Sequence, residues 1–290
     1  MATVSEWIEG ARPRTLPNAV APVVAGVGAA AALDAFSWWR SLLALFVALA
    51  LIIGVNYAND YSDGVRGTDD NRVGPLRLVG SGKAKPKAVL AAALGSLALS
   101  GVLGLLTVVL TGRWLLLVIG GASILGAWFY TGGKKPYGYY GFGEIAVFVF
   151  FGLAGVLGTV YVQAGRLSWA ALACAVAVGS FSTGVLVANN LRDIPTDIEA
   201  GKRTLATRLG DQGTRRLYLA LVAVPYVMTI ALWFSYPVTL LALLSAPLLI
   251  KSVQAIRSDA QGRALIPALR DTGFAMLAWA ILTSVGLFVG

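Results

Sequence analysis

Nine apolar stretches are the feature that most restricts how this chain can fold. Each has roughly the 17–25 residues that an α-helix needs to cross a hydrocarbon core of about 30 Å. Only 13% of the 290 residues are charged, whereas soluble domains typically have about 25%. The sequence therefore predicts an all-α, polytopic membrane bundle of about nine transmembrane helices, formed by a single domain and surrounded by a lipid bilayer. The predicted spans are residues 15–33, 41–58, 88–110, 114–130, 141–163, 169–188, 217–235, 237–256 and 272–290.

The basic residues between these spans predict an orientation. Of the 23 Lys and Arg residues, Arg40, Arg113 and Arg166 fall on one side of the predicted membrane, and all others fall on the opposite side. Cytoplasmic connections carry an excess of Lys and Arg. We therefore expect a multi-pass protein of the plasma membrane with a cytoplasmic N-terminus and an external C-terminus. The same bias accounts for most of the +9 net charge, so no nucleic-acid partner is expected.

The missing residue types exclude several kinds of chemistry. The chain has no histidine, which excludes His-based acid–base catalysis, Ser-His-Asp triads and His-ligated zinc. Its one cysteine, Cys174, lies in an apolar stretch and cannot form an intrachain disulfide. With a single Cys, the chain also has no Cys cluster for metal binding or redox chemistry.

Half of the acidic residues lie in two short segments, residues 56–70 and 189–199. Each segment begins where an apolar span ends on the predicted cytoplasmic side. Ionisable groups at membrane depth are costly and usually functional. Asp and Asn at a helix end could also be simple caps, but two such clusters in one chain favour a functional site.

The two segments share the spacing Asn-x-x-x-Asp, 130 residues apart, and this suggests an internal duplication that faces a common cavity. Positions four apart lie on one helix face, so Asn59 pairs with Asp63, and Asn189 is in a row with Asp193 and Asp197. Pro195 leaves the second row open, because it could kink the helix or occupy its first turn.

The surroundings of these carboxylates predict a magnesium-bound diphosphate. Oxygen ligands without His or Cys suit Mg²⁺, which binds one or two carboxylates together with substrate phosphates. Lys and Arg bind the remaining phosphate oxygens. Arg66 and Arg77 are near the first cluster, Lys202 follows the second, and Lys134 lies between the two in sequence. Glu144 begins the fifth span and could cap it or pair with Lys134 or Lys135.

The motifs resemble those of a known family. The segments NDYSDGVRGTDD and NNLRDIPTDIEAGKRTLATRLG resemble the two aspartate-rich motifs of the UbiA superfamily of intramembrane aromatic prenyltransferases. The segments ARPRTLPNAVAPVVAG, RVGPLRLVGSG and YTGGKKPYGYYGFGEIAVFVFFG extend the likeness along the chain. Within the superfamily it is greatest to the subfamily that prenylates 1,4-dihydroxy-2-naphthoate in menaquinone synthesis.

The resemblance implies a nine-helix bundle around a central cavity and transfer of a polyprenyl group from polyprenyl diphosphate to an aromatic acceptor, 1,4-dihydroxy-2-naphthoate, with loss of CO₂ and pyrophosphate. Other acceptors, such as 4-hydroxybenzoate, homogentisate or a glycerol phosphate lipid, stay open. A cation-coupled transporter is the alternative from another class, but it would place its acids at mid-membrane.

The resemblance also implies roles for individual residues. The expected Mg²⁺ ligands and catalytic carboxylates are Asp60, Asp63, Asp193 and Asp197. Many family members have a further Asp at the place of Gly67, so whether Asp69 reaches a metal stays open. The residues expected to bind the diphosphate are Asn59, Arg66, Tyr130, Lys134, Asn189 and Lys202. Lys134 is also expected to be catalytic, and Asn18 is expected to line the cavity.

Overall fold

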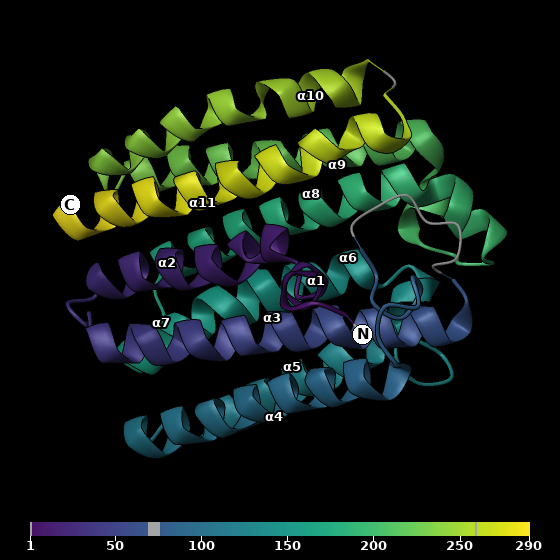
Figure 1. Cartoon of the computed structure of the whole chain (residues 1–290). Coiled ribbons are helices and arrows are strands. Elements are labelled where there is room, and N and C mark those ends of the chain that lie inside the picture. Colours follow the sequence, from purple (N-terminus) through teal and green to yellow (C-terminus); the bar gives the residue numbers. More distant parts are fainter. Residues whose placement is uncertain (1, 69–75, 259) are drawn as a thin grey trace.

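The computed structural model describes residues 2–68, 76–258 and 260–290, and every regular element among them is helical. Long helices run roughly side by side in one bundle, with the two chain ends at opposite ends of it (Figure 1). The elements are α1 (Val4–Gly10), η1 (Pro13–Thr15), α2 (Pro17–Ala31), α3 (Trp38–Arg66), α4 (Pro86–Thr111), α5 (Leu115–Phe129), η2 (Tyr137–Tyr140), α6 (Gly143–Val147), η3 (Phe148–Leu157), α7 (Gly158–Ala164), α8 (Trp169–Glu199), α9 (Leu205–Trp233), η4 (Pro237–Leu249), α10 (Ile250–Arg257), η5 (Gly262–Leu265) and α11 (Ile266–Val289).

The predicted spans agree with these elements, and the all-α membrane bundle is confirmed. Each predicted span overlaps one helix or one run of joined helices, such as α6, η3 and α7. Within the described residues, seven segments are long and apolar enough to cross a membrane. The other two predicted spans are α2 and α5, which have 15 residues each and are shorter than the roughly 20 residues of a typical span. The count of nine therefore stays a prediction.

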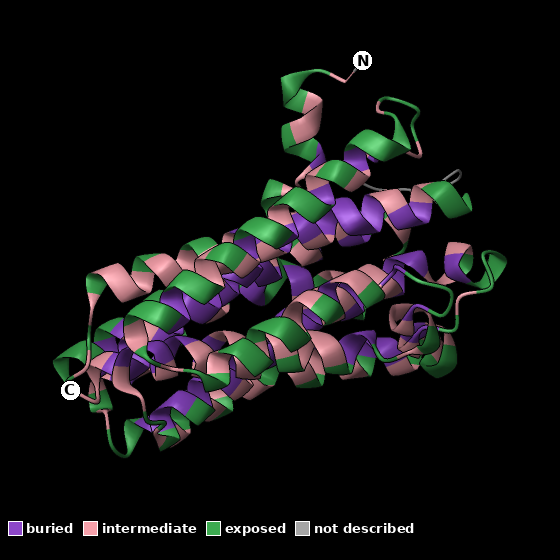
Figure 2. Ribbon diagram, turned by 90° about the horizontal axis from the view of Figure 1, so that it is seen from below, coloured by how far each residue is buried: buried purple, intermediate pink, exposed green. Residues whose placement is uncertain are grey.

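Helix α8 forms the centre of the bundle. In its most apolar window 78% of the residues are buried, against 22% in α4, and Figure 2 shows the buried residues on the inward faces of the helices. Small side chains let its neighbours approach closely. A Cβ atom added to Gly152 of η3 would lie 2.6 Å from the Cα atom of Gly179 in α8. This contact fixes α8 against the wall of the fifth span.

The two helices that carry the Asp motifs extend beyond their apolar parts. α3 ends at Gly67, whose left-handed conformation (φ 71°) closes the helix at little steric cost for a glycine. α8 continues through Pro195 to Glu199, which answers the question that this proline left open. The row of Asn189, Asp193 and Asp197 therefore lies on one helix face.

The close approach of η3 to α8 gives a first prediction. Gly152→Ala should lower the free energy of unfolding by about 1–3 kcal/mol, because a packed backbone must shift to admit the methyl group. Gly158→Ala, in the same run of helices, is the matched control, since a Cβ atom there meets nothing within 4 Å. Thermal unfolding in detergent measures both variants, and equal midpoints would contradict the packing.

Candidate active site

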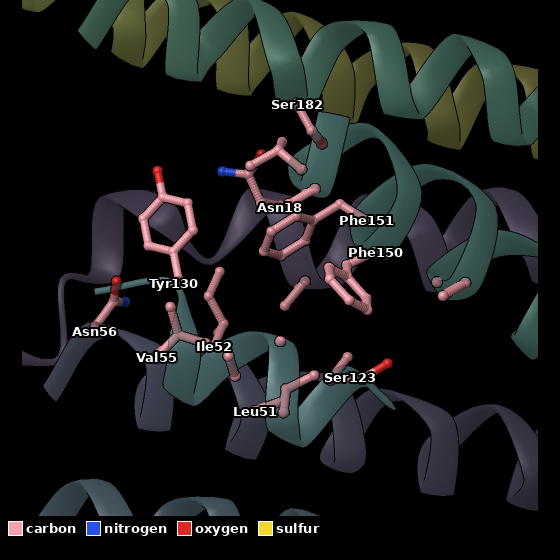
Figure 3. A pocket seen from close by; sticks show the side chains of 18 of the residues that line it. Asn18, Leu51, Ile52, Val55, Asn56, Ser123, Tyr130, Phe150, Phe151 and Ser182 are labelled. Carbon is pink, nitrogen blue, oxygen red and sulfur yellow. The ribbon is translucent and has the colours of Figure 1, made fainter. Parts of the chain in front are cut away.

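A cavity of about 710 Å³ lies between α2, α3, α4, α5, the α6–η3–α7 run and α8. Along α3 its lining runs from Ala44 to Asp63, which corresponds to about 28 Å at 1.5 Å per residue. Its wall is apolar over most of this length, and Figure 3 shows Leu51, Phe150 and Phe151 among the side chains that line it. The polar residues of both motifs lie at one end, which we term the motif end.

The two motifs meet in this cavity. Asn59 and Asp63 of α3 line it together with the α8 row of Asn189, Asp193 and Asp197. All three aspartates are buried, with 4–8% of their surface exposed. Carboxylates that are 130 residues apart in sequence thus share one enclosed space.

Each of these three aspartates has a cationic partner. Arg77 Nη2 lies 3.4 Å from Asp63 Oδ2, and Lys202 Nζ lies 3.7 Å from Asp197 Oδ1. Arg192 binds Asp193 with two nitrogens, Nε to Oδ1 at 2.6 Å and Nη2 to Oδ2 at 2.7 Å. The motif end therefore combines buried anions with the kind of cations that bind phosphate oxygens.

Tyr139 joins the two motifs across the mouth of the cavity. Its hydroxyl donates to Asp63 Oδ1, while its ring lies 5.6 Å from the Arg66 guanidinium and 4.7 Å from Lys202 Nζ. Its carbonyl accepts from the Arg203 N–H at 2.9 Å. Burial, followed by the nearby Asp63 carboxylate, raises the pKa of the Tyr139 hydroxyl. The hydroxyl therefore stays protonated and remains a donor.

Asp60 does not line the cavity, although the sequence predicts it as a metal ligand. It is fully buried, and its two oxygens accept from the backbone N–H groups of Leu78, at 2.7 Å, and Val79, at 2.9 Å. The reason is geometric, because consecutive helix residues are turned by about 100° and Asn59 and Asp63 already face the cavity. Asp60 instead holds the segment that presents Arg77 to Asp63.

Two predicted diphosphate ligands also lie outside the cavity lining. The Arg66 guanidinium donates to the carbonyls of Thr131 and Gly133, so it ties α3 to the segment after α5. Lys134 is exposed. Asp69 lies outside the described residues.

The remaining predicted residues lie around the cavity. Lys202 and Tyr130 line it, as does Asn18, and Figure 3 shows Asn18 and Tyr130 beside the same space. Asn59 accepts from the Thr131 hydroxyl at 2.7 Å. Glu144 accepts from Asn190 Nδ2 at 2.9 Å and sits behind the lining.

The donor set fits a magnesium ion held jointly by protein and substrate. Among the described residues, no three Asp or Glu side chains form a ready-made metal cluster. Mg²⁺ seldom needs one, because it binds through one or two carboxylates, waters and substrate phosphates. Asp63, Asp193 and Asp197, with the amides of Asn59 and Asn189, supply oxygen donors of that kind on facing helices.

Sequence reasoning missed the roles of Tyr139 and Arg192, and it did not distinguish Arg77 from the other basic residues beside the first motif. Arg192 follows the pattern of a topology-determining residue, yet it is adjacent to Asp193 and the two side chains pair. Tyr139 had no signal beyond its position in an aromatic, glycine-rich segment. Contacts between distant segments were needed to identify it.

The Asp60 contacts generate the second prediction. Asp60→Asn should lower the free energy of unfolding by about 1–3 kcal/mol, since one of the two accepting oxygens becomes an NH₂ donor and leaves a buried N–H group without its acceptor. Glu9→Gln is the control, because within the described residues exposed Glu9 accepts one long bond, of 3.4 Å, from Leu76 N in the same segment. Chemical unfolding in detergent gives both values, and a loss for Glu9→Gln as large as for Asp60→Asn would refute the assignment.

Comparison with known proteins places these features in a wider group. The model of the UbiA prenyltransferase family matches residues 19–287. The 1,4-dihydroxy-2-naphthoate octaprenyltransferase of Mycobacterium tuberculosis is 60% identical over 290 residues, which are 100% of this chain and 99% of that protein. The protein of the same name from Mycobacterium leprae is 56% identical over 287 residues, covering 99% of this chain and 97% of that protein.

The fold has a counterpart among solved structures. A UbiA homolog from Archaeoglobus fulgidus bound to GPP and Mg²⁺ matches with a TM-score of 0.74 over 98% of this chain and 100% of that chain. The two sequences are 14% identical, so this likeness concerns the fold alone.

Proposed function

This chain belongs to the UbiA prenyltransferase family, and from that membership we propose that it transfers a polyprenyl group from polyprenyl diphosphate to 1,4-dihydroxy-2-naphthoate. The products are demethylmenaquinol, CO₂ and pyrophosphate, as in menaquinone biosynthesis. The acceptor follows from the two relatives of that name, which match this chain over almost its whole length. The observation that carries the proposal is the meeting of both Asp motifs at one end of a long apolar cavity.

The proposed diphosphate site is the motif end. Asp63, Asp193 and Asp197 would hold Mg²⁺, with Asn59 and Asn189 in support. When bound, Mg²⁺ would neutralise the charge that develops on the leaving pyrophosphate. Two further residues of this end, Arg77 and Lys202, lie close enough to these carboxylates to bind the phosphate oxygens that the ion leaves free.

The proposed reaction has three steps. The allylic C–O bond of the polyprenyl diphosphate breaks, and its electron pair leaves with pyrophosphate. The electron-rich ring carbon that bears the acceptor carboxylate then bonds to the allylic carbon. Loss of CO₂ returns the electrons of the C–C bond to the ring. The apolar wall around Phe150 and Phe151 keeps water away from the allylic cation.

Asp60 and Arg66 serve as positioning residues in this proposal, because their polar atoms are engaged by backbone groups. We leave Lys134 out, since it is exposed and outside the lining. The acids at the end of the cavity beside Arg and Lys suit a diphosphate better than an ion pathway through mid-membrane. We further propose that the protein resides in the plasma membrane with the motif end toward the cytoplasm.

An acceptor assay tests the function. Membranes that contain the protein, Mg²⁺ and a polyprenyl diphosphate should prenylate 1,4-dihydroxy-2-naphthoate with release of one CO₂ per product, and EDTA should stop the reaction. Asp193→Asn should lower the rate by about 100-fold or more, since the loss of an outer-shell partner alone costs about 10–100-fold in metal affinity or activity. Asp271→Asn in α11 is the control, because Asp271 pairs with exposed Arg270 and does not line the cavity. If the protein prenylated 4-hydroxybenzoate faster than 1,4-dihydroxy-2-naphthoate, without CO₂ release, the proposed acceptor would be contradicted.

Tyr139 gives the fourth prediction. Tyr139→Leu should raise the KM for polyprenyl diphosphate several-fold, because each cation–ring contact with Arg66 or Lys202 is worth about 0.5–1 kcal/mol. Tyr139→Phe keeps the ring and removes only the hydroxyl, so its KM should lie nearer to that of the parent protein. Steady-state kinetics at saturating acceptor separate the two. An equal KM for both variants would show that the ring contacts contribute nothing.

A further inference from the structure

Two arginines lie beside the C-terminal end of α7. This is the end of the bundle opposite the Asp motifs, and we term it the far end. Arg40 lies in the first turn of α3, and Arg113 lies between α4 and α5. Arg40 Nη1 donates to the Gln163 carbonyl at 2.7 Å. The Arg113 guanidinium packs against Gly165, where an added Cβ atom would lie 2.2 Å from Arg113 Cζ. Figure 1 shows α7 beside the first part of α3.

Aromatic rings hold both guanidinium groups in place. Arg40 Cζ lies 5.2 Å from the centre of the Trp39 ring, and Arg113 Cζ lies 5.7 Å from the centre of the Tyr161 ring. Stacking of this kind orients a guanidinium without neutralising its charge. The two cations are therefore positioned in advance of any ligand.

No carboxylate of the described residues pairs with either of these arginines, and within the same ranges Arg113 makes no hydrogen bond. Three donors are enclosed there without an acceptor, namely Arg40 Nε, Arg113 Nε and Gln163 Nε2. Asp34, the acidic side chain of this end, is exposed. The carbonyl end of α7 offers only a partial negative charge.

We propose that the far end binds the phosphate group of an anionic phospholipid through Arg40 and Arg113. Two neighbouring cations that pair with no carboxylate favour an anionic ligand. The guanidinium group of arginine can donate two parallel N–H bonds to the oxygens of a phosphate. Both residues are half-buried, so their terminal nitrogens are the atoms that a headgroup reaches. Exposed Trp38, Trp114 and Trp169 surround this end, as expected at the level of lipid headgroups.

Native mass spectrometry of the full chain in neutral detergent tests the site with three probes: phosphatidylglycerol, phosphatidylcholine and inorganic phosphate. The parent protein should retain phosphatidylglycerol over phosphatidylcholine. Arg113→Gln and Arg40→Gln should each weaken that retention by about tenfold. Arg166→Gln is the matched control, because Arg166 is exposed and immediately follows Gly165. All three variants should keep parental prenyl transfer, which also shows that they fold.

The outcomes separate the sources of the phosphate. Equal retention of the two lipids by the parent protein, or an equal loss in Arg166→Gln, overturns the proposal. Inorganic phosphate that binds as strongly as the lipid, and is lost in Arg113→Gln, would keep the phosphate site but overturn the lipid as its source. Lipid retention is measured independently of turnover, so failure of the proposed enzymatic function would leave this test intact.

Discussion

The pairing of buried carboxylates with cations at the motif end is the interaction on which the candidate site depends. Asp63, Asp193 and Asp197 share one enclosed space, where like charges repel strongly. Their partners come from three places in the chain: Arg77 from a connection, Arg192 from α8 itself and Lys202 from just beyond α8. The magnesium-bound diphosphate that we propose for this space would exchange partners with groups that are already paired and positioned.

A second layer of contacts holds these partners in place. Asp60 fixes the backbone at Leu78 and Val79, and this brings Arg77 to Asp63. Arg66 fixes the carbonyls after α5, and Tyr139 then reaches Asp63 from the same segment. Two charged residues of the first motif, Asp60 and Arg66, thus hold the polypeptide around the site. The motif builds the mouth of the cavity as well as part of its lining.

The architecture could be predicted from the sequence because it follows from length and polarity alone. Apolar stretches bounded by charged connections located every long helix, and the four-residue spacing put Asn59 with Asp63 and Asn189 with Asp193 on common faces. Spacing could not tell which side of α3 the adjacent Asp60 would face. It also could not reveal Tyr139 or the Arg192–Asp193 pair, because those contacts depend on how connections fold back over the helix ends.

Because α8 lies at the centre of the bundle, one helix determines both the packing of the core and the positions of the site residues. Its middle is packed through Gly179 against the fifth span, and its end carries Asn189, Asp193 and Asp197 into the cavity. A substitution that adds volume at Gly179 would tilt or shift the helix and so displace Asp193 and Asp197, which lie about four and five turns further along it. Side-chain size at the centre of the bundle and the positions of the reactive carboxylates at its mouth are therefore under a common evolutionary constraint.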